Sequence, residues 1–583
     1  MRRRYPRHKP MTLHLTNILN SVLLPVSFSS RRHLIVKYSS YKFLQLSALV
    51  IMLASCMEPS NKPAASMNNS NANPLSVEIA QGQLKGAWAE SETGIRSFHG
   101  IPYALPPSGS LRWRPPQSPV PWQGLRSATA AGSSCWQAIN VDGWVWSRGE
   151  FNRSEDCLYL NIWSAKNSVK APVMVWFHGG SHLSGMGHDL IFNGTELAKN
   201  GVILVSINYR LGPLGFLAHP ALSAESEQSS SGNYGLLDKI AALQWVQSNI
   251  AAFGGDADNV IIFGQSAGSQ SVCSLMVAPL AQGLFHKAIG QSAACVRPVS
   301  EQDSNGLLRG ARLVDSLAVG TDVNAMREAS PQQLLDAAEA IQWQNQSRIV
   351  VDGWVLPDQP DALFTAGKQA KVPLLLGSLA NEGNQLFPLN NDLTEAQLVS
   401  FTTTMMGEKL APELLALYQN ELAESPGLAQ REILTDQFMA YGMRRWAAHQ
   451  FEAGQPTYLY FMDHSPPAFR LYMPSNPDLQ LEGGPRSGGA YHSGDLAYVF
   501  GNTHKVGHDW QEADHQLSDL ITQYWTNFAK FGDPNAAGLP LWPQYNTTSH
   551  STQVLQEKPH SVDGSRRVRI DLFDRRFGGQ QRH

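Results

Sequence analysis

Charged residues are scarce in this chain of 583 residues. Only 16% are Asp, Glu, Lys or Arg, whereas 43% are apolar. This composition excludes a disordered chain, because there is ample apolar material for a large buried core. No internal repeat is visible either, and the length still fits one large α/β unit.

Acidic residues are absent from the first 56 positions, which hold nine Lys or Arg. Without these nine positive charges the formal net charge falls from −3 to −12. The rest of the chain is therefore acidic, and it lacks the basic surface that binding to phosphates requires. Nucleic acid is thereby excluded as the partner.

A long hydrophobic run is missing at the N-terminus, where the apolar stretch covers only residues 43–54. This stretch is too short for a membrane span and is typical of a signal-peptide core. It ends at Leu53-Ala54-Ser55-Cys56, which resembles a bacterial lipoprotein box, in which the cysteine is lipidated and becomes the new N-terminus. The alternative is an ordinary cleaved signal or a plain anchor with a chance cysteine.

These features divide the chain into three parts. Residues 1–56 are interpreted as an N-terminal extension with a lipoprotein-type signal peptide, 57–74 as a flexible tether, and 75–583 as a single domain. About forty residues precede the apolar run, more than a signal needs, which indicates an assigned start too far upstream or a twin-arginine signal at Arg31-Arg32. We expect an exported protein anchored to a membrane only through Cys56, or otherwise a periplasmic or secreted one.

Cysteines are few. With Cys56 set aside, four remain, and an exported protein permits disulfides among them. The simplest pairing joins sequence neighbours, Cys135 with Cys157 and Cys273 with Cys295. The alternative of buried free thiols stays open, and it is more plausible for the second pair.

From residue 172 onward, buried strands alternate with amphipathic helices. Apolar runs at 173–177, 202–207, 259–263 and 372–376 indicate strands, and residues 233–253 place apolar side chains at helical spacing before Gly254-Gly255. This alternation predicts an α/β fold, with a central, mostly parallel twisted sheet and helices on both faces. The stretches 300–345 and 391–450 are predicted to be mainly helical insertions that lie over the sheet.

Gly264-Gln265-Ser266-Ala267-Gly268 is the only G-x-S-x-G motif, and it joins an apolar strand to a helix. This context is the one that the motif requires, because the glycines permit a tight turn that exposes the serine hydroxyl. The helix that follows directs N–H groups and its positive dipole end at developing negative charge. Ser266 is therefore the candidate nucleophile.

A serine nucleophile needs a base and an orienting acid, which follow it in the order acid, then histidine, in this kind of fold. His492 lies in a Gly-rich loop near the end of the chain, and His464 is a weaker rival. His504, His508 and His515 lie in polar stretches typical of solvated surface. Glu382 closely follows the strand at 372–376, at the strand end where such a sheet builds its site.

An oxyanion hole requires backbone N–H groups at a second strand end. His178-Gly179-Gly180-Ser181 follows the strand at 173–177, and glycine lets the backbone approach a substrate. We predict that N–H groups of Gly179, Gly180 and Ser181, with that of Ala267, form this hole.

At this point the sequence resembles the type B carboxylesterase family, which includes the cholinesterases. The similarity extends from about Val77 to Tyr545. It rests on several long motifs in the right order: 253–268, 155–161, 208–216, 232–238, 351–353, 381–383 and 524–534.

The resemblance implies the α/β-hydrolase fold, with helical insertions over the active site, and places the family's acid and base on Glu382 and His492. It also implies a Cys135–Cys157 disulfide, and it gives Ser292 a role in supporting the catalytic network. Neither a metal nor an organic cofactor is expected.

Two positions depart from the family pattern. Ser181 replaces the usual third glycine of the oxyanion loop, so we expect a narrower approach with activity retained. Gln265 replaces a common Glu that helps cholinesterases hold a cationic substrate, which argues against choline esters. Trp144 or Trp146 could still face a cation, but both are better interpreted as lining an apolar substrate gorge or lid.

The predicted function is hydrolysis of small-molecule carboxylic esters through an acyl-enzyme, by a Ser266–His492–Glu382 triad. A lipase or a cholinesterase-like enzyme would share this triad. The alternative from another class is a non-catalytic binding protein of the same fold, which the intact triad argues against. Neither the natural ester nor the oligomeric state is fixed by the sequence.

Overall fold

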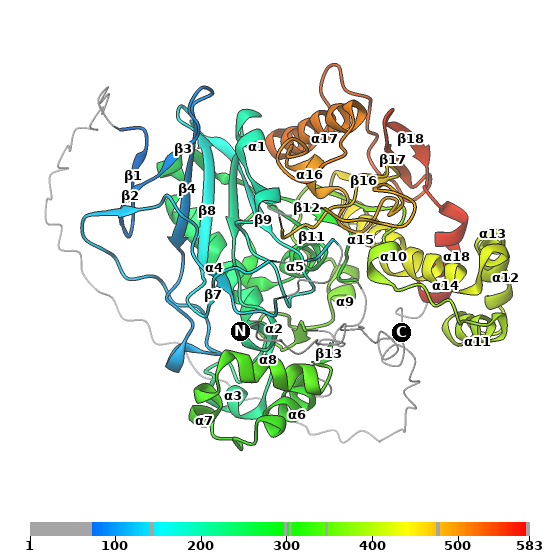
Figure 1. The fold of residues 1–583 in the computed structure, drawn as a ribbon, viewed down its shortest axis with the longest axis horizontal. Helices are drawn as coiled ribbons and strands as arrows, with labels where there is room; N and C mark the ends of the chain where they lie inside the picture. Colours follow the sequence, from blue (N-terminus) through cyan, green and yellow to red (C-terminus); the bar gives the residue numbers. More distant parts are fainter. Residues whose placement is uncertain are drawn as a thin grey trace, which may run out of the picture.

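An eleven-stranded sheet organises the molecule (Figure 1). The computed structural model describes residues 73–139, 145–147, 149–296, 300–301, 306–343, 348–473 and 478–578. The strands of this sheet are, in spatial order, β18 (His560–Asp563), β17 (Ser551–Leu555), β16 (Thr457–Met462), β15 (Leu374–Leu379), β12 (Lys287–Gln291), β11 (Gly255–Gln265), β9 (Ala171–Phe177), β10 (Ile203–Ile207), β8 (Tyr159–Ala165), β4 (Ile95–Pro102) and β3 (Ala87–Glu90).

The strands from β17 to β10 run parallel to one another. Toward one edge, β10 and β8, β8 and β4, and β4 and β3 pair antiparallel, and at the other edge β17 and β18 do. The four strands predicted from apolar runs correspond to β9, β10, β11 and β15. The predicted α/β architecture with a mostly parallel sheet is confirmed.

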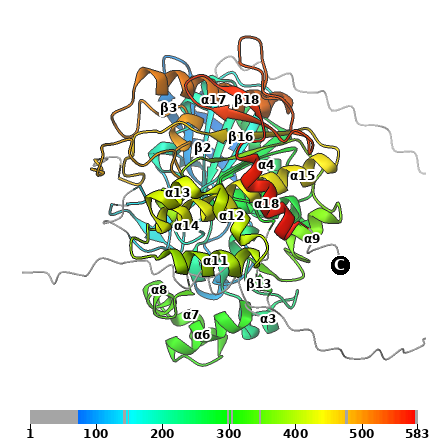
Figure 2. The same cartoon turned by 90° about the vertical axis from the view of Figure 1, so that its right-hand side faces the viewer.

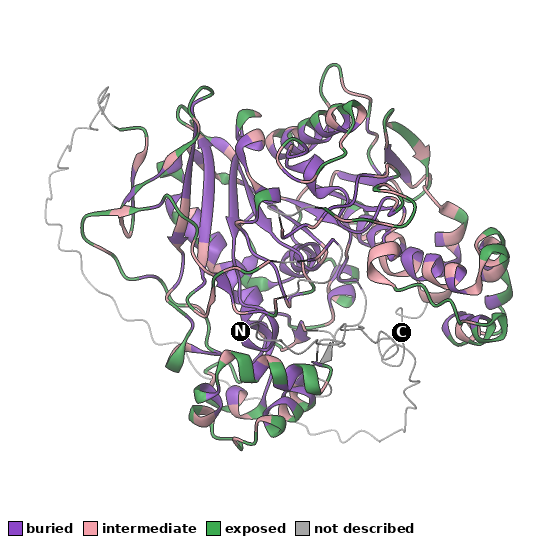
Figure 3. Cartoon of the chain, in the orientation of Figure 1, coloured by how far each residue is buried: buried purple, intermediate pink, exposed green. Residues whose placement is uncertain are grey.

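The central strands are apolar throughout because both of their faces are covered (Figure 3). Successive side chains alternate between two cores: Val173 and Val175 of β9 lie in one, Met174 and Trp176 in the other. The first core includes side chains of α4 (Tyr234–Asn249), α5 (Ala267–Met276) and α15 (Gly442–Glu452), together with side chains of the first insertion. The second takes them from α1 (Thr195–Lys199), α16 (Leu496–Val499) and α17 (Glu512–Phe531).

The predicted helix at 233–253 is α4, extended by a 3₁₀ turn over Ile250–Phe253. It ends at Gly254, whose φ of +88° is the left-handed conformation that closes helices. The smaller elements are β1 (Ser76–Ile79), β2 (Gly82–Lys85), β5 (Leu125–Ser127), β6 (Ser134–Cys135), β7 (Arg153–Ser154), β13 (Ser300–Glu301), β14 (Val350–Val351), α2 (Gly212–Phe216), α3 (Pro220–Glu225), α9 (Pro360–Thr365) and α10 (Gly383–Leu386).

The two insertions are helical as predicted, but only part of them covers the sheet. The first holds α6 (Leu307–Leu317), α7 (Val323–Glu328) and α8 (Pro331–Ala340), and α8 packs on α2, beyond the end of β10. The second holds α11 (Glu395–Met406), α12 (Ala411–Leu417), α13 (Gln419–Glu424) and α14 (Pro426–Thr435), followed by a π-helical turn at Asp436–Tyr441 and by α15.

Of the second insertion, α15 packs on β15 and β16, in agreement with the expectation. In contrast, α11, α12 and α14 form a separate apolar core with α18 (Arg567–Phe577), at one side of the molecule (Figures 1 and 2). Here the expected placement over the sheet is wrong, because these helices bury their apolar faces against one another and against the C-terminal helix. Nonetheless, α14 contacts α10, the short helix that begins directly after Glu382.

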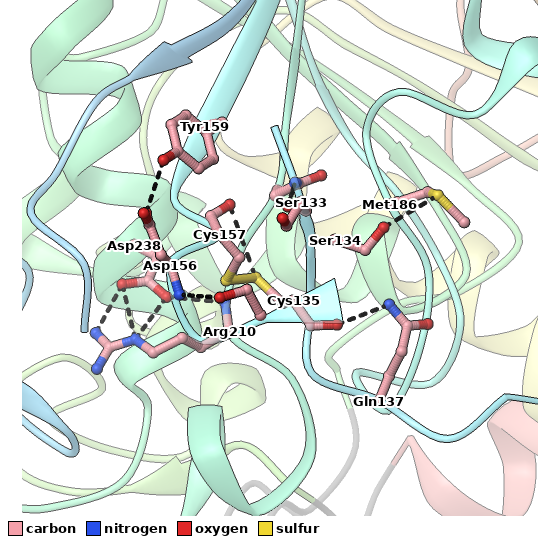
Figure 4. The surroundings of a disulfide bond; sticks show 12 residues. Ser133, Ser134, Cys135, Gln137, Asp156, Cys157, Tyr159, Met186, Arg210 and Asp238 are labelled. Carbon is pink, nitrogen blue, oxygen red and sulfur yellow. Dashed lines mark hydrogen bonds and ion pairs between the residues drawn. A yellow bond between two sulfur atoms is a disulfide. The ribbon is translucent and has the colours of Figure 1, made fainter. Parts of the chain in front are cut away.

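Both predicted cysteine pairs are disulfide-bonded, so the free-thiol alternative is wrong for Cys273 and Cys295. Cys135–Cys157 lies beside β6, where Gln137 Nε2 donates to the Cys135 carbonyl at 3.0 Å (Figure 4). Cys273–Cys295 joins α5 to the loop after β12 and therefore ties together two elements of the candidate site. Among the described residues, no helix is both long and apolar enough to cross a membrane.

Candidate active site

The turn between β11 and α5 holds Ser266 in a strained backbone conformation. Its φ is 57° and its ψ is −124°, a region that non-glycine residues rarely adopt. The Ser266 N–H donates to the Gln291 carbonyl at 2.8 Å, while its own carbonyl accepts from Gln270 N–H at 2.9 Å. The turn is thus fixed on both sides, as a nucleophile elbow requires.

The two glycines of the motif are required by close packing. A Cβ on Gly268 would lie 1.9 Å from the Phe177 carbonyl oxygen, and one on Gly264 would lie 2.5 Å from the Gly268 carbonyl carbon. Neither site can hold a side chain unless α5 moves away from β9. The glycines therefore bring the start of α5 close to the end of β9, where the predicted oxyanion loop begins.

His492 and Glu382 form a fully buried pair. The Nδ1 atom of His492 is hydrogen-bonded to Oε2 of Glu382, and neither side chain is more than 1% exposed. Oε1 of Glu382 accepts from Leu379 N–H at 2.8 Å, so both carboxylate oxygens have partners. Within the described part of the chain, Nε2 of His492 has no hydrogen-bond partner. The pair is arranged to orient an imidazole whose second nitrogen is free to exchange a proton.

Hydrogen bonds to backbone carbonyls connect the His492–Glu382 pair to the turn that holds Ser266. Gln265, which precedes Ser266, donates from Nε2 to the His492 carbonyl at 2.6 Å. Asn381 N–H donates to the Ala490 carbonyl at 2.9 Å, which locks the loop of the acid onto the loop of the histidine. The three predicted triad residues are thereby brought together from three loops at the carboxyl ends of parallel strands.

The loop after β9 has the conformation of a backbone donor site. Gly180 has a φ of +98° and Ser181 one of +56°, and a Cβ on Gly179 would lie 3.1 Å from Ser266 Cβ. The N–H groups of Gly180, Ser181 and Ala267 donate to no other described residue. His182 anchors the loop, since its buried Nε2 is bonded to Ser271 Oγ on α5 at 3.0 Å.

A buried carboxylate that the sequence analysis did not single out lies behind the pair. Asp495 accepts from Gln291 Nε2 at 2.8 Å and from the Tyr460 hydroxyl at 3.0 Å. Burial, reinforced by the nearby Glu382 carboxylate, raises the pKa of Asp495 to about 6. Its place three residues after His492 was the available signal, but the sequence does not show that this side chain turns inward.

Ser292 also lies at the carboxyl end of the sheet, directly after β12. It is fully buried with a φ of 57°, and its N–H donates to the Gly377 carbonyl at 2.9 Å. Its hydroxyl has no partner within the described residues, and neither do Oε1 of Gln265 and Oδ1 of Asp495. Buried polar atoms without protein partners are usual where ordered water or substrate is bound.

The other candidates lie elsewhere or have other partners. His464 is bonded to Asp514 at 2.7 Å, and His504 and His508 are exposed, as predicted. His515 is half-buried and bonded to Thr503.

Two further expectations concerned the tryptophans and metal binding. Trp146 stacks on Tyr472 with ring centroids 5.6 Å apart, whereas Trp144 lies outside the described residues. No cluster of three or more His, Cys, Asp or Glu suited to a metal occurs in the described ranges.

Comparison with known proteins gives the family. The model of the carboxylesterase family matches residues 73–572. The chain is 33% identical to the para-nitrobenzyl esterase of Bacillus subtilis, over 83% of this chain and 95% of that protein. It is 34% identical to the human cocaine esterase, over 81% and 85% of the two chains.

Solved structures agree. A para-nitrobenzyl esterase structure superposes with a TM-score of 0.72 at 31% identity, covering 86% of this chain and all of the other. The carboxylesterase of Geobacillus stearothermophilus gives a TM-score of 0.73 at 32% identity, covering 85% and 99%. The chain belongs to the carboxylesterase family and is a carboxylic ester hydrolase with the α/β-hydrolase fold.

Proposed function

We propose that this enzyme cleaves esters through an acyl-enzyme on Ser266, with His492 as general base and Glu382 as orienting acid. The observation that carries the proposal is the buried His492–Glu382 pair with an unpartnered Nε2, next to a serine in a strained elbow. A pair of this kind supports the serine-triad template, in which the acid fixes the imidazole tautomer.

In the first half-reaction, His492 Nε2 takes the proton of Ser266 Oγ as this oxygen attacks the ester carbonyl. Glu382 stabilises the imidazolium, which then protonates the leaving alcohol. In the second half-reaction, water attacks the acyl-enzyme with the same base, and the carboxylic acid leaves. Both steps use the same proton path between Ser266 and His492.

The negative oxygen of the tetrahedral intermediate is held by the N–H groups of Gly180, Ser181 and Ala267, with Gly179 beside them. These donors have no other partner among the described residues, so no internal hydrogen bond has to break. Each such donor lowers the barrier by roughly 3 kcal/mol. Because Ser181 carries a side chain where a third glycine is usual, the approach is narrower and favours slim acyl groups.

The substrate class is neutral carboxylic esters. Gln265 next to the nucleophile carries no charge, and its amide is engaged by the His492 carbonyl. A cation would therefore find no carboxylate at this position. The relatives named above act on para-nitrobenzyl esters and on cocaine by their names, and both substrates carry the carboxylic ester bond that this site is proposed to cleave.

We further propose that the chain is exported and anchored by a lipid on Cys56, with 57–74 as the tether. The Leu53-Ala54-Ser55-Cys56 sequence after a short apolar run supports this location. Disulfides at Cys135–Cys157 and Cys273–Cys295 are compatible with export. The mass of the mature N-terminal peptide, compared with that of Cys56→Ser, tests the lipid.

The test of the function is release of p-nitrophenol from acyl esters of increasing chain length. Ser266→Ala should lose at least roughly a thousandfold in kcat/KM, while Ser274→Ala, on the same helix, should keep full activity. Equal activity of Ser266→Ala and the parent would reject Ser266 as the nucleophile. The preferred chain length would separate an esterase from a lipase.

A further inference from the structure

The amino ends of the parallel strands lie at the end of the sheet opposite the candidate active site. A groove of about 730 Å³ lies there, between the segment before β9, the end of α1 and the end of α17. Its lining includes Ile95, Val169, Lys170, Lys199, Gly201 and Lys530. None of these residues takes part in the proposed chemistry.

Large apolar side chains are exposed in this groove and next to it. Val169, which lines it, is 83% exposed, and Phe531, which follows the lining residue Lys530, is 73% exposed. Val169 lies just before β9, and Phe531 is the last residue of α17. Apolar side chains that protrude together from an otherwise acidic domain mark an interaction surface.

The groove also holds two lysines without acidic partners. Lys199 is paired with Glu90 and Glu196, so its charge is compensated. In contrast, Lys170 and Lys530 make no ion pair within the described part of the chain. Two uncompensated cations, each next in sequence to an exposed apolar side chain, match an anionic headgroup layer over an apolar interior.

The N-terminal segment enters the domain beside this groove. Arg96 donates from Nη1 to the Pro74 carbonyl at 2.8 Å and from Nη2 to the Phe253 carbonyl at 3.1 Å. Gly254 in turn accepts from Ala171 N–H at 3.0 Å, at the start of β9. Sixteen residues separate Cys56 from Asn73, a length that spans at most roughly 55 Å. An anchor at Cys56 would thus tether the domain from this end of the sheet.

We propose that this edge docks on an anionic lipid surface, with a lipid phosphate between Lys170 and Lys530 and with Val169 and Phe531 inserted among the headgroups. The orientation leaves the carboxyl ends of the strands, and Ser266, facing the water. This inference rests on the proposed membrane location and is independent of the ester chemistry.

A site-specific label tests the contact. In the full chain carrying Cys56→Ser, all four remaining cysteines are disulfide-bonded, so an introduced cysteine is the single free thiol. An environment-sensitive fluorophore on Val169→Cys should brighten with phosphatidylglycerol-containing vesicles and much less with pure phosphatidylcholine. The control is Leu308→Cys on α6, beyond the opposite end of the sheet and 55% exposed, which should stay unchanged.

The charges are tested by sedimentation with the same vesicles. Lys170→Gln with Lys530→Gln should bind roughly thirtyfold more weakly than the Cys56→Ser parent. Lys409→Gln, an exposed lysine after α11, should leave binding unchanged. Hydrolysis of p-nitrophenyl butyrate by every variant verifies folding and keeps this test separate from that of the proposed function.

Three results would overturn the proposal: equal signals at positions 169 and 308, unchanged binding after removal of the two lysines, or binding that is equal on neutral and anionic vesicles. A change in the fluorescence of the Val169→Cys label on addition of inorganic phosphate, with no vesicles present, would assign the groove to a free anion and would likewise overturn the proposal of a membrane contact.

Discussion

The two ends of the parallel sheet differ in how their polar groups are satisfied. At the carboxyl end, Ser181, Ser266 and Ser292 all have positive φ values, and buried atoms such as Nε2 of His492 have no partner among the described residues. At the amino end, Lys170 and Gly201 of the groove residues named above also have positive φ values, but there the polar side chains are exposed or half-buried. Strain together with unpartnered buried atoms is costly, so it persists where function requires it.

The comparison teaches which edge performs chemistry and which is suited to contact. Unpartnered groups at the carboxyl end are buried and directed by neighbouring loops, as a preorganised site requires. Those at the amino end are long lysines, Lys170 exposed and Lys530 half-buried, beside exposed apolar side chains, which suits an extended surface. Matched substitutions should therefore lower activity at the carboxyl end and leave it unchanged at the amino end.

The largest expected effect is that of Glu382→Gln. The amide cannot stabilise the imidazolium and permits the wrong tautomer of His492, so kcat should fall roughly 10²–10⁴-fold in p-nitrophenyl ester hydrolysis. The matched change at the amino end is Glu196→Gln, which removes a partner of Lys199 and Lys505. Activity should be unchanged there. A Glu382→Gln variant as active as the parent would remove the acid from the triad.

Next in size is Gly268→Ala. Its Cβ would lie 1.9 Å from the Phe177 carbonyl oxygen, so α5 must shift, at a cost of about 1–3 kcal/mol of stability and most of the activity. Gly442→Ala, in α15, is the control, because its nearest neighbour would be Ala294 Cβ at 3.5 Å. There the change should stabilise by up to about 1 kcal/mol. Thermal unfolding measures both, and equal Tm values for the two variants would contradict the packing argument.

Asp495→Asn should change how stability depends on pH. Burial raises the pKa of Asp495 from its ordinary value of 3.8 to about 6, so the folded chain binds this proton more tightly than the unfolded chain. The carboxyl therefore destabilises the fold progressively from about pH 4 to 6, and the cost persists above.

Asparagine has no such cost. The Tm of the variant relative to the parent should rise over this pH range, by the equivalent of up to about 3 kcal/mol. A Tm difference that is flat with pH would show that Asp495 is not a raised, buried acid.

Much of the fold and part of the candidate active site were predictable from the sequence. The apolar runs gave the strands of the central sheet, because strands buried on both faces are apolar throughout. Ser266 was found from a short motif with a strand before it and a helix after it. For His492 and Glu382, the chain order and the adjoining loop and strand end gave only candidates, and the family resemblance decided between them and their rivals, since no local pattern shows which distant loops meet.

The rest depends on contacts between distant segments. Asp495 was missed because its inward direction follows from Gln291 and Tyr460, which lie on other strands. The placement of α11 to α14 was wrong because the helical pattern does not say that α18, at the end of the chain, completes their core. The exposed pair Val169 and Phe531 likewise becomes a surface only in three dimensions.

The smallest expected effects come from Ser181→Gly and Lys170→Gly, at the two ends of β9. Both residues have left-handed backbones, with φ values of 56° and 47°, so glycine should stabilise each by roughly 1 kcal/mol. Only Ser181→Gly should also raise kcat/KM for esters with branched acyl groups, by a few-fold. A similar gain in Lys170→Gly would break the distinction between the two ends.

The most direct test of the central claim is trapping of the acyl-enzyme. Rapid mixing with a p-nitrophenyl ester should give a burst of about one p-nitrophenol per chain, and acid quenching should leave the acyl mass on the peptide that contains Ser266. In His492→Ala the burst should vanish. An acyl group on another residue, or turnover without any covalent intermediate, would contradict the account.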